Sequence, residues 1–155
     1  MEVDAAFEGQ RLNVTRFVGQ EGKRGRLNGT GSWRWADGKR WGEYEFRVHA
    51  SDLTATDRET YAIRFGGDFL LRNAVNPRGQ EVLRVTNSTP AVVARGEITL
   101  DFSQPREASE PVPFLYEIVV DVPRNLWYRN LDTETELSGR LTLKNEGSLD
   151  LILGS

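Results

Sequence analysis

The chain has 155 residues and a formal net charge of −3, with 38% hydrophobic and 28% charged residues. This composition is typical of a globular domain, and no linker-like run divides it, so we expect a single domain over residues 1–155. The absence of cysteine excludes disulfides, thiol nucleophiles and thiolate metal sites, and the single histidine excludes a histidine-rich metal site within one chain. No basic block is present, so we do not expect nucleic acid as a partner.

The first ten residues, MEVDAAFEGQ, carry acidic side chains where a secretory signal would carry basic ones. No apolar run approaches the length that spans a membrane. We therefore expect a cytoplasmic protein without membrane contact.

Alternation of apolar and polar residues recurs along the chain, and no apolar helical period extends over three turns. A period of two indicates β-strands with one apolar face. In chain order, we expect a first strand at about 10–18, a mobile polar connection at 19–25 and a hairpin at 26–50.

The hairpin, RLNGTGSWRWADGKRWGEYEFRVHA, is the most informative stretch. Asp37-Gly38 is typical of a two-residue type I′ turn, because both residues tolerate positive φ. This turn predicts cross-strand pairs in which an aromatic ring covers a glycine: Trp33 with Gly42, Gly31 with Tyr44, and Gly29 with Phe46. The opposite face, which includes His49, is polar and is expected to be solvated.

Beyond the hairpin, 51–57 is expected to form a turn or a single helical turn. A second hairpin follows, with strands at 61–65 and 69–73 joined by 66–68. Further strands are expected at 81–86, 91–102 and 114–122, with a proline-rich loop at 103–113. A final hairpin around 145–147 pairs three leucines on each strand: Leu137, Leu141 and Leu143 with Leu149, Leu151 and Leu153.

Eight to ten strands joined by hairpin-length turns permit a closed antiparallel up-and-down β-barrel or a two-sheet β-sandwich. We favour the all-β barrel, because adjacent hairpins form a meander and because closure removes edge strands. A barrel of about eight strands can hold one small ligand. The sandwich, as a non-catalytic interaction or assembly module, stays open as the alternative.

The face predicted to point inward combines aromatic rings with a few polar groups, which is typical of a small-molecule pocket. The same rings could instead fill a dry core. The candidate ligand-binding residues on this face are Trp33, Trp35, Arg40, Phe46, Phe65, Phe69 and Phe114. If chemistry occurs there, the candidates for acid–base or oxyanion-stabilising groups are three tyrosines and one amide: Tyr44, Tyr61, Tyr116 and Asn73. We expect no metal and no cofactor.

Two segments, GRLNGTGSWRWADGKRWGEYEFRV and PRNLWYRNLDTETELSGRLTLKNEGSLDLIL, resemble an uncharacterised bacterial family of small lipocalin-like barrels, a domain of unknown function. Together they cover about a third of the chain, and the stretch from Thr54 to Pro113 departs from the family pattern. The resemblance implies a barrel with a ligand-sized interior, and it adds Trp127 to the ligand-binding candidates. Its family positions are Trp33, Asp37, Gly38, Tyr44 and Trp127.

Other small barrels of this shape, including allene-oxide-cyclase-like ones, act as cyclases or isomerases on natural-product intermediates, which is an analogy of fold alone. Such catalysis works by confinement and orientation and needs no conspicuous motif. We therefore expect a cofactor-free barrel, monomeric or homodimeric, that binds an apolar or aromatic small molecule. Cyclisation or isomerisation of a polyene is the reaction that the analogy suggests.

Overall fold

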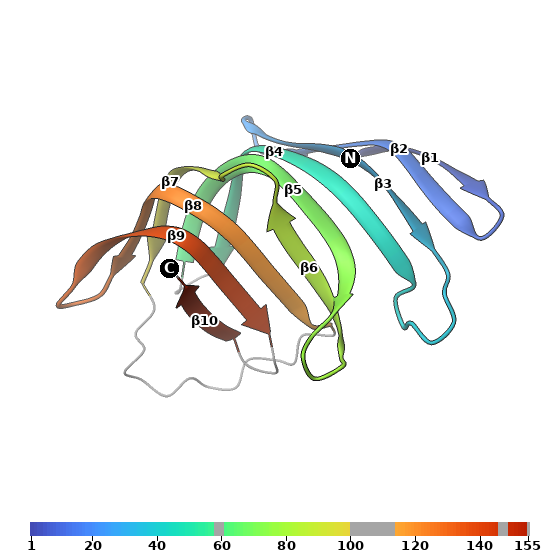
Figure 1. The fold of residues 1–155 in the computed structure, drawn as a ribbon. Coiled ribbons are helices and arrows are strands. Elements are labelled where there is room, and N and C mark those ends of the chain that lie inside the picture. The colour runs from blue at the N-terminus through green and yellow to red at the C-terminus, as the bar shows by residue number, and fades with distance from the viewer. Residues whose placement is uncertain (58–60, 100–113, 146–148, 155) are drawn as a thin grey trace.

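A computed structural model describes residues 1–57, 61–99, 114–145 and 149–154. These residues form ten strands and no helix, and hence no helix that could span a membrane. The strands belong to one strongly curved sheet, which arches over its concave face (Figure 1). They are β1 (Glu2–Glu8), β2 (Arg11–Glu21), β3 (Gly25–Arg34), β4 (Glu43–Asp57), β5 (Tyr61–Val75), β6 (Glu81–Asn87), β7 (Val92–Ile98), β8 (Tyr116–Arg129), β9 (Glu134–Asn145) and β10 (Leu149–Gly154).

The strand order is β1-β2-β3-β4-β5-β6-β8-β9-β10, and β7 pairs with β5 and β8. β6 and β7 lie end to end between β5 and β8, since β6 pairs with the second half of β5 and β7 with the first half. The pairing circuit of β5, β6, β8 and β7 closes on itself, and the other strands extend from it. The prediction of an all-β barrel is thus confirmed, whereas the described strands form no second sheet and hence no sandwich.

Two of the pairings differ from a pure up-and-down meander. β8 runs parallel to both β6 and β7, although every other pairing of the described strands is antiparallel. A parallel pairing needs a long connection between its strands. Here the stretch between Ile98 and Tyr116 provides it. Most of that stretch lies outside the described residues, including the end of the strand expected at 91–102 and the loop expected at 103–113.

β1 precedes the first strand expected from the sequence. All of its residues are exposed, and among the described strands it pairs only with β2, so it is an edge of the sheet. Val3 and Phe7 share the face of their partners Phe17 and Leu12, and Phe7 is 71% exposed. The polar connection expected at 19–25 is shorter than predicted, because β2 and β3 extend into it from both sides.

The register of the β3–β4 hairpin differs from the prediction by two residues. The observed pairs are Trp33 with Tyr44, Gly31 with Phe46, and Gly29 with Val48. Because side chains alternate with a period of two, a shift of two residues leaves every side chain on its predicted face. The ring of Phe46 therefore still packs over a glycine, Gly31 instead of Gly29.

The connection between β3 and β4 explains this shift. Asp37-Gly38 does not form a two-residue hairpin loop. It lies in a longer connection with two consecutive turns, in which Lys39 N donates to Ala36 O (3.2 Å) and Gly42 N donates to Lys39 O (3.3 Å). Gly38 and Gly42 have positive φ, of 76° and 71°, so glycine is required at both turns.

Two predicted turns are wrong, because the chain bends there instead of reversing. β4 continues through 51–57, with a bulge between Ala50 and Leu53 where Asp52 adopts a φ of 53°. β5 continues through 66–68, and the hairpin expected there does not form. Alternation of Leu53 and Ala55 with threonines suits a strand, and glycines at 66–67 allow a sharp bend.

The C-terminal part of the sheet agrees more closely with the sequence. The strand expected at 114–122 corresponds to the first part of β8, which begins at Tyr116. After a bulge between Val122 and Leu126, β8 continues to Arg129. β9 and β10 form the expected final hairpin, with Leu141 opposite Leu153 and Leu143 opposite Leu151. The third expected pair does not form, because Leu149 lies opposite Asn145 and Leu137 lies opposite Leu126 of β8. Most of the turn between them lies outside the described residues.

The densest apolar packing lies at the end of the concave face where β7 meets β8. Val93, Ile98, Val122 and Leu126 form a buried cluster, and Leu126 is only 1% exposed. Tyrosine, isoleucine and leucine side chains from β5, β8 and β9 pack against this cluster. This cluster anchors the circuit of β5, β7 and β8.

Replacement of Gly31 by alanine should destabilise the protein. A Cβ at this position would lie 2.6 Å from Glu45 O and would also collide with the Phe46 ring. We expect a loss of about 1–3 kcal/mol in the free energy of unfolding, measured by urea denaturation. Gly19→Ala is the matched control, because its Cβ would make only ordinary contacts with Leu27, from 3.6 Å outward. Equal stability of the two variants would contradict this packing.

Candidate functional site

The concave face holds a cavity of about 560 Å³, which we call the apolar trough. Its wall comes from β2 to β9, and every lining side chain that the structure describes is apolar except that of Tyr61, which adds one hydroxyl. A cavity of this size and character falls in the range of small-molecule sites. The lining side chains on the central strands include Val48, Ile63, Phe65, Phe69, Val85 and Ile118.

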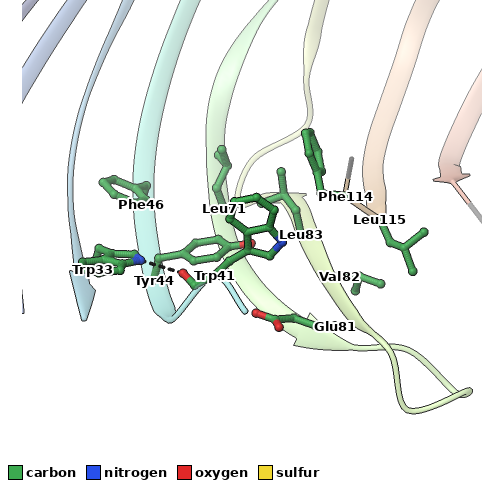
Figure 2. Close-up of a pocket in the computed structure, with 10 residues that line it drawn as sticks. All are labelled: Trp33, Trp41, Tyr44, Phe46, Leu71, Glu81, Val82, Leu83, Phe114 and Leu115. Carbon is green, nitrogen blue, oxygen red and sulfur yellow. Dashed lines mark hydrogen bonds between the residues drawn. The ribbon is translucent and has the colours of Figure 1, made fainter. Parts of the chain in front are cut away.

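A second cavity of about 370 Å³ adjoins the trough, and we call it the aromatic pocket. Phe46 and Leu71 line both cavities, so the two are neighbours on the concave face. Figure 2 shows the ring of Tyr44 extending from β4 toward the ring of Trp41. The remaining lining residues are Trp33, Glu81, Val82, Leu83, Phe114 and Leu115.

The ring of Trp33 is held by the connection that follows β3. Its Nε1 donates a hydrogen bond to Trp41 O (2.7 Å; Figure 2). The close approach requires glycine at position 42, where a Cβ would lie 2.9 Å from Trp33 Nε1. Trp35 packs edge-on against Trp33, with ring centroids 6.2 Å apart. Trp33 is therefore a fixed wall of the pocket.

Tyr44 is fixed by the strand next to its own. Its backbone N–H donates to Asn73 Oδ1 (3.1 Å), so the Asn73 amide positions Tyr44. Burial raises the pKa of the Tyr44 hydroxyl above its usual range, and the negative charge of Glu81 raises it further. The hydroxyl thus remains protonated at neutral pH and can donate a hydrogen bond.

The four candidates for chemistry do not meet at one point. Tyr44 lies in the aromatic pocket, Tyr61 lines the trough, and Asn73 is engaged by the backbone of Tyr44. Tyr116 is half-buried beside Phe114, and its own burial, with the neighbouring Tyr61, raises its pKa.

The candidate ligand-binding residues divide into two groups. Five of them line a cavity: Trp33, Phe46, Phe65, Phe69 and Phe114. The other three line neither cavity. Trp35 is 56% exposed, Arg40 lies over the ring of Trp41, and Trp127 stacks under Arg129. Trp127 neighbours Leu126, whose side chain faces the trough, so alternation places Trp127 on the other face of β8.

Sequence reasoning missed Trp41 and Glu81 as members of the site. The two-residue turn predicted at Asp37-Gly38 places Trp41, the neighbour of Gly42, on the polar face of the hairpin, whereas Trp41 lies in the connection between β3 and β4. Glu81 begins β6, where a carboxylate among alternating apolar residues looks solvated. Alternation along β5 to β9 indicates the aliphatic side chains that line the trough, but periodicity does not show which faces of the strands meet in space.

Outside the two cavities, His49 and Asp68 form a pair on the opposite, polar face. His49 Nδ1 lies 2.7 Å from Asp68 Oδ1, and both side chains are about half exposed. His49 is thus on the solvated face, where the sequence predicted it. Within the described ranges, no group of three or more histidine, aspartate or glutamate side chains could hold a metal ion.

Comparison of the chain with protein-family models, curated proteins and solved structures finds no match.

The influence of Glu81 on Tyr44 can be measured by titration. Glu81→Gln should lower the pKa of Tyr44 toward its usual value of 10.0, because it removes the second cause of the increase and leaves burial in place. Because the pKa of Tyr44 is raised in the folded state, the contribution of its protonated hydroxyl to the free energy of unfolding is fully present below about pH 10. This contribution is lost as the pH rises through the raised pKa. The measurement is phenolate absorbance against pH, with Tyr44→Phe to identify the transition. An unchanged pKa in Glu81→Gln would show that the two groups do not interact.

Proposed function

We propose that the protein binds an apolar small molecule in the trough, without a cofactor. The observation that carries this proposal is the trough itself, about 560 Å³ in volume and lined by apolar side chains from eight strands. Burial of apolar ligand surface in such a cavity contributes about 25 cal/mol per Å² removed from water. The cytoplasmic location stays a prediction.

The wall of the trough favours binding over chemistry. Proton transfer requires a positioned acid or base within hydrogen-bond reach of the reacting group. Tyr61 provides the hydroxyl of the trough, and Tyr44 belongs to the neighbouring pocket. Cyclase or isomerase activity therefore remains a narrower proposal, in which the cavity folds a polyene and a tyrosine assists.

Ala55→Trp should reduce binding of an apolar fluorescent probe, because a large ring at this position fills part of the trough. Ala62→Trp is the matched control. It lies on the adjacent strand β5, is exposed and does not line the trough. We expect at least tenfold weaker binding for Ala55→Trp and unchanged binding for Ala62→Trp, from titrations of probe fluorescence. Equal affinities would show that the probe binds elsewhere.

The catalytic proposal has a separate test. Tyr44→Phe, Tyr61→Phe and Tyr116→Phe each remove one hydroxyl and keep the ring. If one of these hydroxyls assists the reaction, turnover of a polyene substrate should fall about 100-fold in that variant, with binding retained. Unchanged turnover in all three variants would remove the tyrosines from the mechanism.

A further inference from the structure

The aromatic pocket contains the carboxylate of Glu81, and only one of its two oxygens has a hydrogen-bond partner among the described residues. Glu81 Oε2 accepts a hydrogen bond from the backbone N–H of Arg40 (3.1 Å), whereas Glu81 Oε1 is buried and has no hydrogen-bond partner among the residues that the structure describes. In the described part of the chain, Glu81 forms no ion pair within 4.0 Å. An unpartnered carboxylate oxygen in an apolar site is costly, so such a group indicates a missing partner.

The surroundings of Glu81 limit what this partner can be. Figure 2 shows its carboxylate reaching from β6 back toward β4, below the rings of Tyr44 and Trp41. Trp33, Phe46 and Phe114 complete the aromatic lining. A bare divalent cation needs several oxygen ligands, and one carboxylate does not supply them. An organic cation needs only opposite charge and aromatic faces, which attract cations through their quadrupoles.

One ring of the pocket already attracts a cation within the protein. The guanidinium carbon of Arg40 lies 5.3 Å from the centroid of the Trp41 ring. Arg40 is exposed, and its guanidinium forms no ion pair with Glu81. The carboxylate therefore remains available to a ligand.

We propose that the aromatic pocket binds the cationic end of the ligand, an alkylammonium group, while the apolar tail of the same molecule lies in the trough. The tail part of this inference rests on the proposed function. The two cavities share Phe46 and Leu71 in their walls, so a single molecule can occupy both. The ligand class is then a cationic amphiphile.

The charge of Glu81 acts inside the pocket, which supports this assignment. Glu81 is the second cause, after burial, of the increased pKa of Tyr44. A negative charge that raises the pKa of a neighbouring hydroxyl also favours a cation at the same place. The neutral Tyr44 ring keeps its face available for that cation.

The test compares three probes by isothermal titration calorimetry: octyltrimethylammonium, octanol and tetramethylammonium. The first has head and tail, the second has the tail with a neutral head, and the third has the head alone. We expect octyltrimethylammonium to bind about tenfold more tightly than octanol. A difference of this size corresponds to the binding energy of one desolvated cation–π contact together with one favourable charge contact. Its affinity should fall as the salt concentration rises, and that of octanol should not.

Two pairs of variants assign the preference to the pocket. Glu81→Gln should abolish the preference for the cation, whereas Glu45→Gln, which changes an exposed carboxylate on β4 that lines neither cavity, should keep it. Trp41→Leu should reduce the preference, whereas Trp127→Leu should not. Trp127 also carries an arginine over its ring but does not line the pocket.

The outcomes separate the two proposals. Equal affinity for octyltrimethylammonium and octanol, or an unchanged preference in Glu81→Gln, would overturn the cation site and leave the apolar trough intact. If neither octyl probe binds, the trough proposal fails, and the tetramethylammonium titration then tests the cation site by itself. Binding of tetramethylammonium that depends on Glu81 would support the cation site alone, and no binding would overturn it as well.

Discussion

The shape of the molecule depends on a bend that β4 and β5 make together. Each strand has 15 residues, and each changes direction at the same level of the sheet. β4 bends at the bulge between Ala50 and Leu53, and β5 bends opposite it at Gly66 and Gly67. Bulges and glycines increase strand curvature, so the two bends curl the sheet toward its apolar face. Without them, we expect the same alternation to give a flatter sheet without a trough.

The faces of the strands could be predicted from the sequence, because alternation depends only on neighbouring residues. The ends of the strands could not. Asp37-Gly38 favours a tight hairpin locally, but the chain uses a longer connection in which Trp41 O accepts the indole N–H of Trp33. Likewise, Gly66-Gly67 suits either a reversal or a bend. The pairing of β5 with β6 and β7 selects the bend, and those contacts are distant in sequence.

The candidate site likewise has residues that could be predicted from the sequence and residues that could not. Rings at alternate positions, such as Trp33 and Phe46, could be assigned to the inner face from the hairpin alone. Glu81 could not, because its importance arises from a backbone N–H in another segment and from rings on β4. Alternation also overestimated the site: Trp35 lies beyond the end of β3, where alternation no longer fixes its direction. Strand periodicity therefore identifies a wall but not the polar group placed within it.

The two cavities differ in a way that bears on specificity. In the proposed function, the apolar trough by itself selects little among apolar molecules, because the free energy of burying apolar surface depends on area rather than on identity. Glu81 changes this at one end, since its carboxylate in an aromatic lining disfavours neutral and anionic groups that leave it unpaired. A cost to the wrong ligand is as effective as a gain for the right one. Under the two proposals, one charged side chain orients the ligand and selects its class, while the trough provides affinity for the tail.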